Sequence, residues 1–231
     1  TMNDGTDKDD VLPELKHGAH SVTTIYEYSD GYYDRNKKDF YGFGTVKTTF
    51  AYGNCQEDVY FNREYYSKGC INTSTVKTAD GAILSESTTT LEDAPYPLPK
   101  KEESRIYEKS SGTGCYIATA TSYKYDLRYG NCIKITQDFG DGQKLSADIT
   151  YDNTNATDYI IGLPVDIRVY DSNGNLLRYR SGDYDDLGQL KELSQYWVNN
   201  GSCCSTNKLT YDEYGNIKTV SDSRGATLSY V

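Results

Sequence analysis

The chain has 231 residues, of which 36% are hydrophobic, and its 34 acidic and 24 basic side chains give a net charge of −10. This balance argues against a nucleic-acid surface, which needs clustered Lys and Arg, and no apolar run approaches the roughly 20 residues that cross a bilayer. Tyrosine accounts for 24 residues. Because tyrosine packs across strands while its hydroxyl reaches water, this composition predicts a broad sheet with two amphipathic faces.

Residues 1–20 are predicted to form an acidic leader, with Asp at positions 4, 7, 9 and 10, and we expect it to be disordered. The leader has neither the basic nor the apolar region of a secretory signal. This favours a segment cut from a longer protein. His17 and His20 lie three residues apart, and a solvated pair is favoured over a metal site because no other ligand lies near them.

Residues 21–93 are predicted to be β structure. The run from Val22 to Tyr28 is rich in β-branched and aromatic residues, and we expect Asp30-Gly31 to end it in a turn. Residues 54–58 are predicted to be a loop. Further on, Asp80-Gly81 is expected to close a long hairpin.

Residues 94–104 carry three of the five prolines beside a run of charges. Prolines at alternate positions cannot lie in a central strand, so we predict a connection here. Residues 105–231 are predicted to be consecutive hairpins. A helix over residues 186–197 is the alternative for one stretch, because its leucines lie three apart, but Gly188 favours a turn followed by a strand.

One phrase recurs in the last third of the chain: Tyr-Asp-x-x-Gly, then Asn or Gln, then Leu or Ile. Full copies begin at Tyr170, Tyr184 and Tyr211, and a copy at Tyr125 has one extra residue before its glycine, which puts the turn type in doubt there. Asp followed three residues later by Gly predicts a type I turn, in which the carboxylate accepts backbone N–H groups and glycine takes the left-handed position. Such a turn closes a hairpin with a G1 bulge. The predicted repeat-turn residues are Asp171, Gly174, Asp185, Gly188, Asp212, Gly215, Asp222 and Gly225.

No catalytic, cofactor or metal motif is found, and we predict that the chain is not an enzyme. Asp171-x-Asn173-x-Asn175 has the spacing of half a calcium loop, but position 182 is Gly where that loop needs Glu, so a hairpin turn is favoured. The six cysteines form no Cys-x-x-Cys pair, which excludes zinc-finger spacing. Their even number fits disulfides in an oxidising compartment, and buried free thiols fit equally well.

The repeated phrase resembles the YD repeat of the Rhs family. The block from Tyr33 to Gly44, Tyr-Asp-Arg followed by Phe-x-Gly-Phe-Gly, is similar to a segment of the B component of bacterial ABC (Tc) insecticidal toxin complexes. In that family such hairpins join side by side into a long coiling sheet, and the best understood members form a hollow shell around a toxin. The resemblance therefore implies an all-β fold of consecutive antiparallel hairpins in a curved, spiralling sheet.

From the resemblance we expect a non-catalytic structural segment of a secreted or cell-surface protein. Its expected partners are other repeats of the parent protein, toxin-complex subunits and an enclosed effector polypeptide, with edge-to-edge homodimers also open. The alternative is a binding module for carbohydrate or protein that uses exposed tyrosines. Half-buried tyrosines along the sheet would favour the shell, and at least three exposed rings in one concavity would favour binding.

Overall fold

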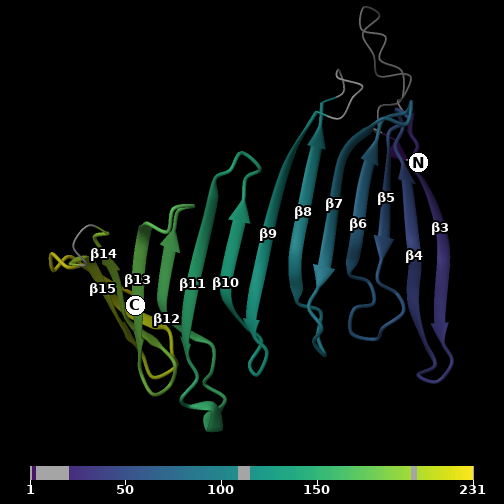
Figure 1. Cartoon of the computed structure of the whole chain (residues 1–231). Helices are drawn as coiled ribbons and strands as arrows, with labels where there is room; N and C mark the ends of the chain where they lie inside the picture. The colour runs from purple at the N-terminus through teal and green to yellow at the C-terminus, as the bar shows by residue number, and fades with distance from the viewer. Residues whose placement is uncertain (1, 4–20, 109–114, 199–201, 231) are drawn as a thin grey trace, which may run out of the picture. The chain divides into compact units, whose positions relative to one another are not determined.

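A computed structural model describes residues 2–3, 21–108, 115–198 and 202–230. Apart from one short 3-10 helix, η2 (Ala156–Asp158), the regular elements of this described part are all strands. Hydrogen-bonded strand order from β3 to β17 repeats chain order, so the strands form successive antiparallel hairpins (Figure 1). The predicted all-β fold of consecutive antiparallel hairpins is confirmed.

The chain divides into two compact units, and the first comprises Thr1–Pro97 with Glu102–Ala118. Within it, each strand from β3 to β7 is antiparallel to the one before. The strands are β3 (Ile25–Asp34), β4 (Asp39–Thr49), β5 (Cys55–Tyr60), β6 (Ile71–Lys77) and β7 (Ile83–Leu91). A separate two-residue pair joins β1 (Met2–Asn3) to β2 (Ser21–Val22). The rest of the predicted leader, including His17 and His20, lies outside the described residues.

Two expectations for the first unit are wrong. Strand β3 continues through Asp30-Gly31 to Asp34. Although Asp30 has a left-handed φ of 55°, the pairing with β4 keeps its register on both sides of it, with Ser29 opposite Thr45 and Gly31 opposite Phe43. Residues 54–58 are not a loop, since β5 begins at Cys55. By contrast, a tight turn does join β6 to β7 at Asp80-Gly81, where Gly81 N donates to Thr78 O at 2.9 Å.

The prolines between β7 and the next strand behave differently from one another. Pro95 and Pro97 lie in the irregular connection, whereas β8 (Pro99–Tyr107) begins at the third proline. A strand's first residue tolerates the missing N–H. The connection expected over residues 94–104 is therefore shorter in the structure, which places residues 99–104 in a strand.

The second unit comprises Leu98–Lys101 and Thr119–Val231. Its hairpins follow one another from β9 to β17 with antiparallel pairing at each step. The helix alternative over residues 186–197 is excluded, because that stretch forms a turn followed by strand β14. The strands are β9 (Tyr116–Asp126), β10 (Asn131–Asp138), β11 (Lys144–Asp152), β12 (Leu163–Tyr170), β13 (Leu176–Tyr184), β14 (Leu190–Tyr196), β15 (Cys203–Tyr211), β16 (Ile217–Ser221) and β17 (Thr227–Ser229).

In the part of the chain that the structure describes, neither unit encloses a thick apolar core. Among the described residues, Tyr41 is the one large hydrophobic side chain that is buried, at 4% exposure. Most strand residues are half-buried, as expected where a single sheet is open on both faces. Stability must then come mainly from cross-strand pairs, with each hairpin depending on its neighbours.

A ladder of side chains crosses the second unit perpendicular to its strands. Lys134 Nζ lies 2.8 Å from Asp148 Oδ1, and Asp148 pairs in register with Arg168 on the next strand. The Arg168 guanidinium lies 4.7 Å from the ring centroid of Tyr179. Tyr179 in turn stacks on Tyr196 with ring centroids 4.3 Å apart. One row thus spans five consecutive strands, joined by an ion pair, a register pair and two ring contacts.

The cysteines give no support to disulfides in the described part of the chain. Cys55, Cys70, Cys115 and Cys132 are free thiols. The side chains of Cys203 and Cys204 lie outside the description. Among the residues that the structure describes, no helix has the length and apolar character of a membrane span.

Candidate functional site

The Tyr-Asp-x-x-Gly turns are the repeated feature of the second unit, and the turn at Asp171 has their common geometry. Gly174 N donates to Asp171 O at 3.2 Å, and Asp171 N donates to Asn175 O at 3.0 Å. Gly174 has a φ of 82°, and the register shifts as the turn is entered, between Val169 and Tyr170. These are the marks of a type I turn followed by a G1 bulge.

The aspartate carboxylate holds this turn from inside. Asp171 Oδ1 accepts from the backbone N–H groups of Asn173 at 2.9 Å and Asn175 at 2.8 Å. Its Oδ2 accepts from Asn175 Nδ2 at 2.9 Å. Both carboxylate oxygens are therefore occupied by amide donors, which is the role of a turn aspartate rather than of a calcium ligand.

The same arrangement recurs at the other predicted turns. Asp212 accepts from the backbone of Tyr214 and from both amide groups of Asn216 at 2.8 to 3.0 Å. Asp185 and Asp222 each accept two backbone N–H groups at 2.8 to 2.9 Å. The glycine three residues after each aspartate has a positive φ: 78° at Gly188, 85° at Gly215 and 86° at Gly225.

The eight predicted turn residues do not form one site. The turns at Asp185 and Asp212 follow β13 and β15, while those at Asp171 and Asp222 follow β12 and β16. Because antiparallel strands alternate in direction, these two pairs lie at opposite ends of the sheet. The repeat therefore builds two rows of hairpin ends rather than a cluster of convergent side chains.

The copy at Tyr125 closes differently, because of its extra residue. Gly130 N donates to Asp126 O at 2.7 Å, four residues apart, so the turn is one residue wider than at Asp171. The aspartate keeps its role, since Asp126 Oδ1 accepts from Arg128 N at 3.0 Å. The aspartate carboxylate thus accepts a backbone N–H group in the longer turn as well.

The bound amides lower the pKa of three turn aspartates, Asp171, Asp212 and Asp222, below the usual 3.8. The largest cause is the side-chain amide of Asn175 at Asp171 and of Asn216 at Asp212, and the backbone N–H of Ala226 at Asp222. A carboxyl group whose pKa is lower in the folded state contributes stability above its unfolded pKa and loses it as the pH falls through the folded value.

We therefore expect the free energy of unfolding to decrease as the pH is lowered from about 5 to about 2. Urea denaturation at a series of pH values measures this slope. Asn can still accept backbone N–H groups but does not titrate, so the triple variant Asp171→Asn, Asp212→Asn, Asp222→Asn should have a shallower slope. An unchanged slope in that variant would mean that the turn carboxylates are not the linked groups.

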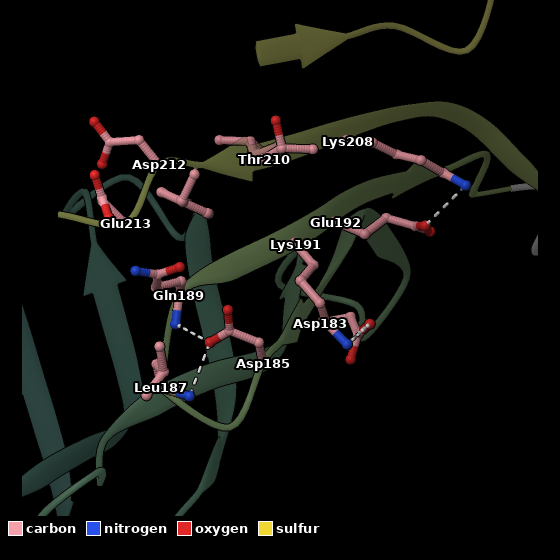
Figure 2. Close-up of a pocket in the computed structure, with 12 residues that line it drawn as sticks. Asp183, Asp185, Leu187, Gln189, Lys191, Glu192, Lys208, Thr210, Asp212 and Glu213 are labelled. Atoms are coloured by element: carbon pink, nitrogen blue, oxygen red, sulfur yellow. Dashed lines mark hydrogen bonds and ion pairs between the residues drawn. The ribbon is translucent and has the colours of Figure 1, made fainter. Parts of the chain in front are cut away.

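A groove of about 630 Å³ lies between the turns at Asp185 and Asp212 (Figure 2). Two of its carboxylates are paired with lysines: Lys191 Nζ lies 3.1 Å from Asp183, and Lys208 Nζ lies 3.7 Å from Glu192. Figure 2 shows Asp185 directed back to the backbone of its own turn. Among the described residues, no group of three or more His, Cys, Asp or Glu side chains is placed to hold a metal ion.

Sequence reasoning missed a second repeated feature of the same unit, which involves the tyrosine that precedes four of the turns. Each of these tyrosines donates its hydroxyl to a backbone carbonyl at the start of the preceding strand. The pairs are Tyr125 with Pro99 at 2.8 Å, Tyr151 with Cys132 at 3.0 Å, Tyr184 with Pro164 at 3.3 Å and Tyr211 with Leu190 at 2.9 Å.

These four hydroxyl bonds tie alternate hairpin ends to the strand behind them. Their rings are half-buried, and burial raises the pKa of Tyr151 and Tyr184, so both remain neutral donors at ordinary pH. Tyr151-Asp152 was missed as a member because no glycine follows at the third position. The Tyr-Asp pair alone would have found it.

In the first unit, the Phe-x-Gly-Phe-Gly block packs against Asp30, the residue of β3 that has a left-handed φ. The side chain of Asn62, only 4% exposed, donates to Asp30 O at 2.7 Å. Arg63 pairs with the Asp30 carboxylate at 2.5 Å. A Cβ atom on Gly44 would overlap the Asp30 side chain, which explains a glycine at that position.

We expect Asn62→Ala to destabilise the chain by about 1 to 2 kcal/mol, because it leaves the Asp30 carbonyl without its buried donor. Arg63→Ala is the matched control: it removes an exposed ion pair and should cost less than about 1 kcal/mol. Urea denaturation of both variants measures the difference. Equal losses would mean that the Asn62 contact does not hold the irregular strand.

The same block buries the hydroxyl of Tyr41. It donates to Asp34 Oδ2 at 2.9 Å, and burial together with this carboxylate raises the pKa of Tyr41 to about 12. The Asp34 carboxylate also accepts the backbone N–H groups of Asn36 and Lys37 at 2.8 and 3.1 Å. Asp34, in the Tyr-Asp-Arg start of the block, is therefore another turn aspartate, and it also accepts a hydrogen bond from the Tyr41 hydroxyl.

The chain is similar to known toxin proteins in sequence and in fold. A model of the insecticide toxin TcdB middle/N-terminal region matches residues 10–74, which include the Phe-x-Gly-Phe-Gly block. No curated protein matches the sequence. The resemblance of this chain to the B component of Tc toxin complexes is confirmed.

Solved structures extend the likeness of fold to most of the chain. The crystal structure of TcdB2-TccC3 without its hypervariable C-terminal region has a TM-score of 0.62 and 10% identity, over 91% of this chain and 18% of that one. That of TcdB2-TccC3 has a TM-score of 0.51 and 12% identity, over 84% of this chain and 16% of that one. This chain thus spans less than a fifth of either neighbour.

Proposed function

We propose that this chain is a non-catalytic structural segment of an Rhs/YD-repeat toxin-type protein, forming part of the wall of a β-shell that encloses or presents a toxin cargo. The observation that carries the proposal is the fold: hairpins in chain order, similar to TcdB2-TccC3 over 91% of the chain with a TM-score of 0.62. The match of residues 10–74 to a toxin-complex B component also supports a structural role in a toxin complex.

In this proposal the work of the chain is mechanical. Aspartate turns close several hairpins of the second unit without a bulky loop, and tyrosine hydroxyls bind alternate hairpin ends to the preceding strand. Half-buried tyrosines along the sheet are what the shell interpretation requires. A curved, spiralling wall built in this way needs neighbouring repeats on both edges, because unpaired strand edges invite further pairing.

The partners follow from the same proposal. They are other repeats of the parent protein, the toxin-complex subunits and an enclosed effector polypeptide, in a secreted or cell-surface protein. An isolated copy of the chain leaves β3 and β17 as sheet edges, so edge-to-edge homodimers are expected in solution. We propose no enzymatic activity and no nucleic-acid partner.

The proposal is tested by protease protection of the protein encoded by the full reading frame that contains this chain. An enclosed effector should resist a protease added to the intact protein and become cleavable once mild denaturant opens the wall. A cargo equally cleavable in both states, with the hairpins still folded by circular dichroism, would refute enclosure.

A binding module remains the second candidate, favoured by one groove in the first unit. There Tyr65 and Tyr66 are 42% and 63% exposed, beside the half-buried rings of Phe61 and Tyr96. Two exposed rings fall short of the three that this interpretation requires. Glycan-array binding that is lost in Tyr65→Ala and Tyr66→Ala would favour it over a purely structural role.

A further inference from the structure

Three hairpin connections meet in one groove at the end of the first unit where β3, β5 and β7 finish. They are the β3–β4 turn, the β5–β6 loop and the segment after β7, and together with Leu91 at the end of β7 they line a volume of about 470 Å³. The connections lie at the same end because alternate connections of an antiparallel meander do so (Figure 1). Such a volume suits a ligand the size of a side chain or headgroup.

The β5–β6 loop is held in shape by its own backbone. Phe61 N donates to Cys70 O at 2.9 Å, and Gly69 N donates back to Phe61 O at 3.0 Å. Inside this closed loop, Lys68 N donates to Glu64 O at 3.0 Å. The aromatic residues that the loop carries are therefore positioned before any ligand arrives.

The aromatic rings of the groove already attract cations from within the chain. Lys37 Nζ lies 4.6 Å and Lys68 Nζ lies 4.4 Å from the ring centroid of Tyr65, distances at which a cation interacts with a ring face. Tyr66 lies at right angles to Tyr65, with centroids 5.2 Å apart. Among the described residues, Tyr66 has no cation over its ring, and it is 63% exposed.

The charged side chains that line the groove also favour a cationic ligand. Its lining includes the carboxylates of Glu64, Glu92 and Asp93 and the ammonium group of Lys37, while Lys68, the other cation near Tyr65, is paired with Asp39. In the described part of the chain, neither Glu64 nor Asp93 enters an ion pair, and both are exposed. This excess of acceptors disfavours anionic ligands.

We propose that this groove binds an organic cation, an ammonium or guanidinium group that lies against the ring of Tyr66 and is neutralised by Glu64 and Asp93. Aromatic rings with nearby carboxylates are the usual means of holding such a group. The ligand can be a basic side chain of a polypeptide or a free or lipid-borne quaternary ammonium, since these share the same chemistry. The proposal is independent of the shell.

The test uses two probes that differ in charge alone: N-acetyl trimethyl-lysine amide and its neutral isostere, in which carbon replaces the quaternary nitrogen. Binding to the purified chain is followed by NMR titration. We expect saturable binding of the charged probe, weakened by added salt, and binding of the neutral isostere weaker by about tenfold. Comparing the affinities for choline chloride, for vesicles with choline headgroups and for a lysine-rich peptide then shows which kind of molecule supplies the cation.

Variants locate the site. Tyr66→Ala should lower the affinity for the charged probe by about tenfold while Tyr66→Phe retains it, because the ring and not the hydroxyl makes the contact. Glu64→Gln and Asp93→Asn should each weaken binding severalfold. Tyr52→Ala, which removes a 91% exposed tyrosine in the β4–β5 connection, is the matched control and should have no effect.

Several results would overturn the proposal. They are no binding of the charged probe at millimolar concentration, equal binding of the two probes, and binding that survives Tyr66→Ala in a variant whose circular dichroism is unchanged. Binding of neutral oligosaccharides that is lost in Tyr66→Ala, without any response to the charged probe, would assign the groove to carbohydrate instead.

Discussion

Replacing Gly188 by alanine should destabilise the second unit by about 2 to 4 kcal/mol. Gly188 has a φ of 78°, a conformation that costs an ordinary residue about 1 kcal/mol or more. An added Cβ would also lie only 2.9 Å from Ile160 Cγ2, and such overlap costs about 1 to 3 kcal/mol in packed structures. Urea denaturation of the variant measures the loss.

Gly174→Ala is the control for this prediction, because it isolates the backbone cost. Gly174 has nearly the same φ, 82°, but nothing lies within 4 Å of an added Cβ. The control should therefore lose only about 1 kcal/mol. Equal losses at the two positions would mean that Gly188 is required for its conformation alone and that the turn does not pack against Ile160.

The second large loss of stability is expected when a turn tyrosine is removed. Tyr151→Ala should lower the free energy of unfolding by about 2 to 3 kcal/mol, which is below the range for a fully buried ring because Tyr151 is half-buried. Tyr151→Phe should lower it by about 1 kcal/mol, because only the hydroxyl bond to Cys132 O is lost. Chemical denaturation of both variants gives the two values. Tyr214→Ala, at an 81% exposed turn position, should change stability by less than about 0.5 kcal/mol.

Loss in Tyr151→Ala but none in Tyr151→Phe would contradict the role given to the hydroxyl. The ring would then contribute only packing, and the row of four hydroxyl bonds would be incidental. If the row does tie the hairpin ends together, each Tyr→Phe change at positions 125, 184 and 211 should cost a similar amount.

Local chemistry explains what could be predicted from the sequence. An aspartate and a glycine three residues apart specify their own turn, so the positions of the hairpin ends at Asp171 and Asp212 follow from a few neighbouring residues. The alternation of Val165, Ile167 and Val169 likewise specifies a strand. Each of these features is decided within a single hairpin.

The errors arose where the deciding partner lies far along the chain. Residues 54–58 look like a polar loop, but Asp58 accepts from Ser74 at 2.5 Å and from Gln56 at 3.0 Å, so a polar strand is satisfied by its neighbour. Asp30-Gly31 looks like a turn until Asn62, 32 residues later, is found to bind its carbonyl. The backbone acceptors of the turn tyrosines are hidden from sequence for the same reason.

The groove at Tyr66 shows the same limit for a candidate site. Lys37, Tyr66 and Asp93 come from three separate hairpin connections, and no short motif unites them. What the sequence does contain is the order of the hairpins. Alternate connections of a meander share an end of the sheet, so counting hairpins places these three segments together before any contact is known.

The central claim is that these hairpins form a stretch of shell wall, and the most direct measurement is a cryo-EM map of the protein encoded by the complete reading frame. The account predicts a closed β-shell in which strands β3 to β17 lie consecutively in the wall, with density for an enclosed polypeptide inside it. A map in which the same strands form an open sheet with no enclosed chain would contradict it.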